Sequence, residues 1–218
     1  MTPAPAGKED PLTRTPHGVQ FEAHRPDIMG RNGMVSSGHP LASQAGIRML
    51  QKGGNAVDAA LATVAVLNVV EPFMSGMGGI GVALVYVAKE GRVRALDFSG
   101  RAPKAAEPSV FVDDEARGVG ILSSLVPGNV AGWMTMHDAY GSMDRERLFE
   151  PAIHHAENGF PLTSFGARIT AAFAHRLRPH ASSASIILDG DGRSPRPGDF
   201  IRNPRLAESF RQVARHGK

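Results

Sequence analysis

The stretch Gly53-Gly54-Asn55-Ala56-Val57-Asp58-Ala59-Ala60 joins two expected helices. Its two glycines tolerate the left-handed backbone that commonly ends a helix, so they should stop the helical segment that begins near Leu41. Asn55 can cap the next helix with its side chain, and Asp58 falls in the first turn, where a negative charge suits the helix dipole. These eight residues therefore predict a tight junction between two helices.

The second of these helices, Ala56–Val70, is apolar on nearly every side. Such a helix is normally buried, and we expect it to pack against a sheet. Its longest apolar run, 59–70, is interrupted by Thr63 and Asn68 and is shorter than the ~20 residues that span a bilayer. The segment is therefore interpreted as a core helix.

A β-hairpin should follow this helix. Pro72 ends the helix, and the glycine-rich segment 75–81 forms a loop. Residues 82–87 and 93–98 are rich in β-branched and aromatic side chains, and 89–91 (Lys-Glu-Gly) is a turn signal.

The rest of the chain is expected to be mainly helical. The other predicted elements are short strands at 34–37 and 119–126, helices at 129–140, from Asp144 to about Asn158 and from Thr163 or Ser164 to about Arg178, a loop at 182–200, and a last helix that Asn203 and Pro204 begin. This order predicts an α/β or α+β fold with a helix-rich second half.

Composition narrows the class of protein. The 218 residues are 42% hydrophobic and 21% charged, which is typical of a soluble globular protein. A net charge of +3, with one tryptophan and two tyrosines, argues against a nucleic-acid partner. The absence of cysteine excludes disulfides and thiolate chemistry.

The N-terminal segment 1–31 is polar and proline-rich, without periodicity. We interpret it as a flexible arm that precedes one domain at 32–218. It has no apolar region typical of a signal peptide, so a cytoplasmic location and no membrane association are expected.

Several motifs that often carry chemistry are out of context. Residues 76–81 match G-x-G-x-x-G, but a helix precedes them and a strand follows, the reverse of a dinucleotide site. The adjacent His154 and His155 would point about 100° apart on a helix, so no metal site is predicted. No G-x-S-x-G is present, and the serines near glycines are assigned to turns. No cofactor is therefore expected.

Two further polar features receive structural interpretations. His39 precedes Pro40 at the start of an expected helix, and local hydrogen bonding is its favoured role over catalysis. The run Asp113-Asp114-Glu115 is interpreted as a solvated acidic patch. From the residues alone, the chain is a soluble α/β domain without a recognisable active site.

Four blocks, in this order, resemble the γ-glutamyltranspeptidase family. They are 33–43 (GMVSSGHPLAS), 53–60 (GGNAVDAA) with 70–72 and 75–79, 99–103 (SGRAP), and 126–133 (VPGNVAGW) with 151–153 and 156–161. The resemblance implies an N-terminal nucleophile hydrolase, an αββα sandwich with helices outside two antiparallel sheets. It also implies a proenzyme that cleaves itself, so that the new N-terminal threonine of a small subunit attacks a γ-glutamyl amide such as glutathione.

The Thr-Thr-His-like run that carries this threonine in the family does not occur in the sequence. No catalytic residue is therefore assigned. We interpret the chain as part of the large subunit of an amidohydrolase or acyltransferase, inactive alone and partnered by the missing small subunit. The alternative is a catalytically inactive remnant.

Arg101 is the candidate substrate-binding residue. Typical γ-glutamyltranspeptidases have an R-E-x-A-P block whose arginine holds the substrate carboxylate, and Ser99 occupies that position here. The S-G-R-A-P form is similar to the branch with cephalosporin-acylase-like enzymes and oxamate amidohydrolase, which implies another small carboxylate amide as the alternative substrate. A guanidinium suits a carboxylate, but Arg101 as a structural ion-pair partner is an equal alternative.

Overall fold

The computed structural model describes residues 28–111, 118, 120 and 123–217. The chain divides into two compact units, residues 1–34 and 35–218. Residues 28–34 contain no helix or strand. Most of the predicted flexible arm lies outside the described residues, so its boundary at residue 31 stays a prediction. Within the described part, no helix is long and apolar enough to cross a membrane.

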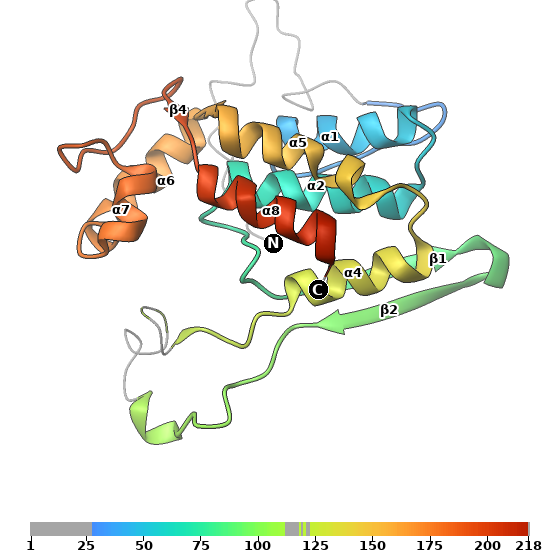
Figure 1. Cartoon of the computed structure of the whole chain (residues 1–218), viewed down its shortest axis with the longest axis horizontal. Coiled ribbons are helices and arrows are strands. Elements are labelled where there is room, and N and C mark those ends of the chain that lie inside the picture. Colours follow the sequence, from blue (N-terminus) through green and yellow to red (C-terminus); the bar gives the residue numbers. More distant parts are fainter. Residues whose placement is uncertain (1–27, 112–117, 119, 121–122, 218) are drawn as a thin grey trace, which may run out of the picture. The chain divides into compact units, whose positions relative to one another are not determined.

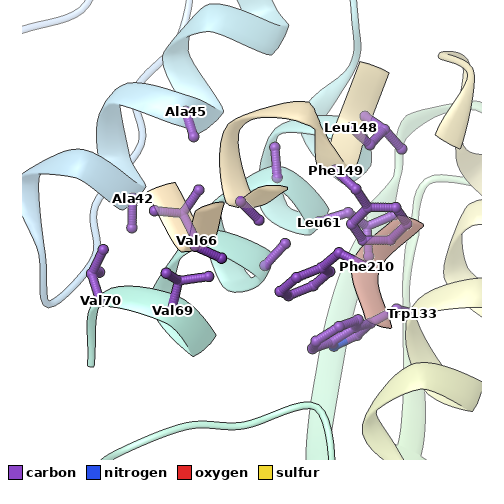
Figure 2. Close-up of a cluster of buried hydrophobic side chains, with 14 of the residues drawn as sticks. Ala42, Ala45, Leu61, Val66, Val69, Val70, Trp133, Leu148, Phe149 and Phe210 are labelled. Carbon is purple, nitrogen blue, oxygen red and sulfur yellow. The ribbon is translucent and has the colours of Figure 1, made fainter. Parts of the chain in front are cut away.

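Five helices contribute most of the core of the second unit. They are α1 (Pro40–Gln51), α2 (Ala56–Val70), α4 (Asn129–Tyr140), α5 (Arg145–Asn158) and α8 (Pro204–His216). Helix α2 packs against α1 and α5, and α5 packs in turn against α8 (Figure 1). Figure 2 shows Leu61 and Val66 of α2 among side chains from the neighbouring helices, including Phe149 and Phe210.

Helix α2 is buried as predicted: hairpin side chains pack against the core that contains it, and its main neighbours in the described residues are helices. The principal sheet of the described residues is a two-stranded hairpin, which is too narrow to cover a helix of 15 residues. Helices α1 and α5 pack against it, and small residues such as Ala42 and Ala45 allow the close approach.

The junction between α1 and α2 forms as the glycine pair predicted. Gly53 adopts a left-handed φ of 89°. The Gly54 N–H donates to the Met49 carbonyl at 2.9 Å, and the Gly53 N–H donates to the Leu50 carbonyl at 3.1 Å. This pair of bonds is the Schellman arrangement, which satisfies the last carbonyls of the helix.

The cap of α2 is also confirmed. The Asn55 side chain accepts from the N–H groups of Val57 at 2.8 Å and Asp58 at 3.1 Å, and Asp58 accepts the Asn55 N–H at 2.8 Å. This reciprocal capping box is possible because the two polar residues are three positions apart.

The predicted hairpin consists of β1 (Gly81–Val87) and β2 (Arg92–Phe98), which pair antiparallel from Gly81↔Phe98 to Val87↔Arg92. The short 3-10 helix η2 (Ala88–Glu90) and Gly91, with a φ of 63°, form the connection. One face of the hairpin packs on the core, and the other face is exposed. Figure 1 shows the hairpin beside α4 (Asn129–Tyr140).

The remaining described elements are the 3-10 helix η3 (Pro108–Val110), α6 (Ser164–Leu177), α7 (Ala181–Ile187), and a small sheet of β3 (Phe160–Pro161) and β4 (Phe200–Ile201). The loop predicted at 182–200 is wrong over its first six residues, because α7 forms there and packs against α6. The fold is α+β with a helix-rich second half.

Two predicted strands do not form in the described residues. Residues 34–37 are irregular, because no described segment pairs with them. Residues 123–126 are not a strand either, and a single Val126 N–H to Arg101 carbonyl bond of 3.0 Å joins them to the chain after β2. The rest of the 119–126 segment lies largely outside the described residues.

Candidate functional site

The candidate site is a hollow of about 470 Å³ between the end of β2 and the first turns of α4. Its lining includes Arg101, the predicted substrate-binding residue. The other lining residues are Leu96, Asp97, Phe98, Ser99, Gly100, Gly128, Ala131, Gly132 and Thr135.

Glycines allow α4 to approach the end of β2 closely. A methyl group at Gly132 would lie 2.3 Å from the Phe98 ring, and one at Gly128 would lie 2.1 Å from the Phe98 carbonyl oxygen. A methyl group at Gly81, on β1, would lie 2.5 Å from the same ring. The Phe98 side chain therefore occupies a space that exists only because these three positions are glycines. The position of Phe98 in turn fixes where the turn from Ser99 to Arg101 leaves the strand.

The glycine loop before β1 supports the other side of the α4 N-terminus. The Gly79 carbonyl accepts the N–H groups of Gly128 and Asn129, both at 3.0 Å, and the Asn129 amide donates to the Gly76 carbonyl at 2.7 Å. These hydrogen bonds make the segment a tight structural loop, and it leads into a strand as expected.

Two hydrogen bonds and one left-handed glycine fix the backbone around Arg101. The Ser99 N–H donates to Asp97 Oδ1 at 2.9 Å, and hydrogen bonds from the Ser99 side chain and backbone lower the pKa of Asp97 below its usual range. Gly100 has a φ of 79°, and Val126 donates to the Arg101 carbonyl. These contacts form a sharp turn after β2.

The side chain of Arg101 is exposed at the hollow. It makes no hydrogen bond or ion pair with any residue that the structure describes. The alternative of a structural ion pair therefore has no support within residues 28–111 and 123–217. Its role as a carboxylate ligand stays a prediction.

Of the other singled-out residues, His39 is the N-cap of α1. Its Nδ1 accepts the Leu41 N–H at 3.2 Å, which confirms the predicted local hydrogen bonding, and burial lowers the pKa of its ring. The rings of His154 and His155 are 5.4 Å apart, centre to centre. The acidic run 113–115 lies outside the described residues.

The described part of the chain contains no recognisable set of metal ligands. No group of three histidine, aspartate or glutamate side chains there is placed to hold an ion. The residues that line the hollow can supply a guanidinium, a carboxylate and hydroxyl groups to a small polar ligand. They can bind and orient, but they include no activated nucleophile.

Residues of the turn between α4 and α5 were missed from the sequence. Ser142 and Met143 donate their N–H groups to Asp58 Oδ1 at 3.0 and 3.3 Å, and the Ser142 hydroxyl contacts Asp58 Oδ2 at 2.5 Å. The Asn55 amide also donates to the Tyr140 carbonyl at 2.7 Å. Sequence spacing could not reveal a contact across more than 80 residues.

The solved structures that resemble this chain define the class of protein. A γ-glutamyltranspeptidase of Helicobacter pylori matches with a TM-score of 0.83 and 33% identity, over 88% of this chain and 56% of that chain. A cephalosporin acylase of Bacillus halodurans matches with a TM-score of 0.73 and 30% identity, over 91% of this chain and 40% of that chain. The α+β fold of this chain therefore matches that of N-terminal nucleophile hydrolases of this type.

The family follows from the sequence match. The model of the Gamma-glutamyltranspeptidase family matches residues 42–218, and the chain belongs to this family. The glutathione hydrolase proenzyme of Bacillus subtilis (strain 168) is 33% identical over 204 residues, which are 90% of this chain and 34% of the relative. The chain thus spans about a third of the length of the curated relatives that it matches.

Proposed function

We propose that this chain is the substrate-holding part of an amidohydrolase or acyltransferase that acts on γ-glutamyl amides such as glutathione. A threonine outside these 218 residues supplies the nucleophile. The observation that carries the proposal is Arg101, a guanidinium without a described partner at the hollow between β2 and α4, in a chain of the γ-glutamyltranspeptidase family.

In this proposal, the chain binds the substrate, and the missing small subunit (the partner segment) supplies the nucleophile. Arg101 binds the substrate carboxylate, and the turn at Ser99 and Gly100 holds the arginine in place. The threonine of the partner attacks the amide carbon, and its own α-amine takes the hydroxyl proton. Holding the carboxylate fixes the distance between the amide and the nucleophile, which lowers the entropic part of the barrier.

The outer face of the hairpin supports a covering partner. Val82, Leu84 and Tyr86 are 65%, 73% and 65% exposed, and they lie in a row on β1. The paired residues on β2, Ala95 opposite Leu84 and Val93 opposite Tyr86, continue the apolar surface. An exposed apolar sheet face of this kind is typical of an interface, and we propose the missing small subunit as its occupant.

A second candidate substrate class is favoured by the S-G-R-A-P block. The resemblance to a solved cephalosporin acylase extends over 91% of this chain. In addition, Arg101 lies two residues after Ser99, and Ser99 occupies the position where typical γ-glutamyltranspeptidases have their arginine. A small carboxylate-bearing amide other than a γ-glutamyl compound, of the acylase or oxamate type, is therefore the alternative.

The first test is to read the DNA that follows the codon of Lys218. A frame that encodes a Thr-Thr-His-like run supports the proposal, and a native stop with nothing after it supports the inactive remnant. The chain is then produced together with the encoded segment. Faster hydrolysis of γ-glutamyl-p-nitroanilide than of a glutaryl amide or oxamate favours the first substrate class, and the reverse order favours the second.

A further inference from the structure

Helix α6 carries the same short motif twice. Phe165 and Arg168, and then Phe173 and Arg176, form two F-x-x-R units whose members are three residues apart and whose starts are eight residues apart. Three residues make almost one helical turn, so each arginine lies next to its own phenylalanine. The second unit follows the first by about 12 Å along the helix axis, from the rise of 1.5 Å per residue.

The two units form cation–π pairs at the surface. The Arg168 guanidinium carbon lies 6.0 Å from the centre of the Phe165 ring, and that of Arg176 lies 5.3 Å from the centre of the Phe173 ring. The two phenylalanines are nevertheless 48% and 44% exposed. Stacking on a ring leaves the planar edge of a guanidinium free to donate hydrogen bonds.

The first unit is supported from another element. The Phe73 ring, in the segment that follows α2, packs edge-on against Phe165 with the ring centres 5.8 Å apart. The opposite side of α6 is buried through small residues, among them Gly166, Ala167 and Ala174. The exposed rings therefore lie on the side of α6 away from these buried residues, and Figure 1 shows α6 and α7 at the edge of the helical layer.

The charge of this region has one sign. From residue 158 to residue 188 there is no aspartate or glutamate, while Arg168, Arg176 and Arg178 are all present, with His175 and His180. Neither Arg168 nor Arg176 forms an ion pair with a residue that the structure describes. An exposed face with paired rings and uncompensated guanidinium groups is complementary to a surface that is both acidic and apolar.

We propose that this face of α6 is a docking site for an acidic, partly apolar segment of a protein partner. Two carboxylates that are offset by about 12 Å along the helix axis and by about 80° around it would each meet one guanidinium, and apolar side chains between them would cover the two rings. Lipid insertion fits less well, because a guanidinium already covers part of each ring. Stacking of nucleic-acid bases is disfavoured for the same reason, since it needs an open ring face.

The test is a binding titration of the whole chain with a fluorescein-labelled peptide of glutamates and leucines, followed by fluorescence anisotropy. We expect the peptide to bind and its affinity to fall as salt is added. The double substitution Arg168→Glu/Arg176→Glu should lower the affinity about ten-fold or more, because attraction between opposite charges becomes repulsion. Phe165→Ala/Phe173→Ala should weaken it about three-fold or more through lost apolar contact. Arg168→Lys/Arg176→Lys should lie between, since the charge remains and the planar stack is lost.

The matched control is Arg205→Glu/Arg215→Glu, which makes the same charge change on exposed positions of α8. Equal loss of binding in this control overturns the proposal, and so does binding that the α6 substitutions leave unchanged. Tighter binding of anionic phospholipid vesicles or of a single-stranded oligonucleotide, with the same dependence on Arg168 and Arg176, also overturns it. If the charge-reversed chain unfolds, the wild-type chain is compared on peptides with glutamate or glutamine, and equal affinity overturns the proposal.

Discussion

The buried carboxylate of Asp58 binds Ser142 through both the backbone N–H and the hydroxyl of that serine, although 84 positions separate the two residues. Asp58 also accepts the N–H groups of Asn55 and Met143, so one side chain joins the start of α2 to the turn between α4 and α5. Burial by itself raises the pKa of Asp58, but the hydrogen bonds from Ser142, Asn55 and Met143 outweigh it and hold the pKa below its usual range.

Replacing Asp58 should therefore destabilise the fold strongly. Asp58→Ala leaves several partly buried N–H groups without an acceptor, and we expect the free energy of unfolding to fall by about 2–4 kcal/mol. Ser142→Ala removes only the hydroxyl contact and should cost about 1 kcal/mol. Urea denaturation followed by circular dichroism measures both. The control is Asp138→Ala, whose carboxylate is largely exposed, and an equal loss there would contradict this role of Asp58.

Stability should decrease on mild acidification because of two histidines. Burial lowers the pKa of His39, and burial followed by the charges of His154, Arg48 and His39 lowers the pKa of His155. The folded state thus binds protons at these rings less readily than the unfolded chain. The contribution of these two neutral rings to the free energy of unfolding is complete at neutral pH. It is lost as the pH falls below about 6.5, the usual pKa of histidine.

The double substitution His39→Asn/His155→Gln should reduce the loss of stability between pH 7.5 and pH 5.5, since asparagine keeps an N-cap acceptor and neither residue titrates. Urea midpoints at the two pH values measure the effect. The Asp58 carboxylate does not interfere in this window, because a lowered carboxylate pKa is lost only at more acidic pH. An unchanged pH dependence in the double variant would show that other groups are responsible.

A single methyl group at Gly132 should disturb the candidate site. Gly132→Ala places a carbon 2.3 Å from the Phe98 ring, and we expect a loss of about 1–3 kcal/mol. Phe98→Leu in the same chain should recover part of the loss, because the smaller side chain yields space. Gly190→Ala is the control, since nothing lies within 4 Å of its added methyl group. The melting temperatures of the wild type, Gly132→Ala, Gly132→Ala/Phe98→Leu and Gly190→Ala test this expectation. A Gly132→Ala chain with the wild-type melting temperature would refute the close packing.

The exposed face of the hairpin should cause self-association of the chain alone. Val82→Thr/Leu84→Thr lowers the apolar area on β1 and places β-branched side chains, which suit a strand, at both positions. We expect more monomer at high concentration and little change in melting temperature, as measured by sedimentation velocity and calorimetry. The wild-type chain as a stable monomer with no tendency to associate would contradict the proposed partner interface.

Arg101 is tested in the chain produced with its partner segment. Arg101→Ala should lower kcat/KM by about 30- to 1,000-fold, the effect of losing a charge-assisted contact worth about 2–4 kcal/mol. Arg101→Lys should recover only part, since a point charge cannot replace the planar fork. Self-cleavage and melting temperature should not change. Arg94→Ala, at an exposed ion pair with Glu90, is the control.

A structural role for Arg101, the alternative, predicts a different pattern of results. A structural residue would lower the melting temperature and impair maturation, while the KM of the remaining enzyme stayed the same. An Arg101→Ala enzyme that matures normally with wild-type kcat/KM would exclude both roles.

Local chemistry was sufficient to predict most of the helices and the hairpin. Gly53, Asn55 and Asp58 determine the junction of α1 and α2 because caps and left-handed glycines act over three or four residues. The hairpin follows from the turn at Gly91 for the same reason. The family was also evident in the sequence, since its blocks are short and stand in a defined order.

Only the tertiary structure decided which surfaces meet. The sequence alone could not show that Asp58 binds Ser142, or that three glycines close around Phe98, because these contacts join residues far apart in the chain. A helix at 181–187 was missed because its stability depends on packing against α6 rather than on propensity. The exposed position of Arg101 likewise depends on the turn after β2 and on the approach of α4, which are properties of the folded chain.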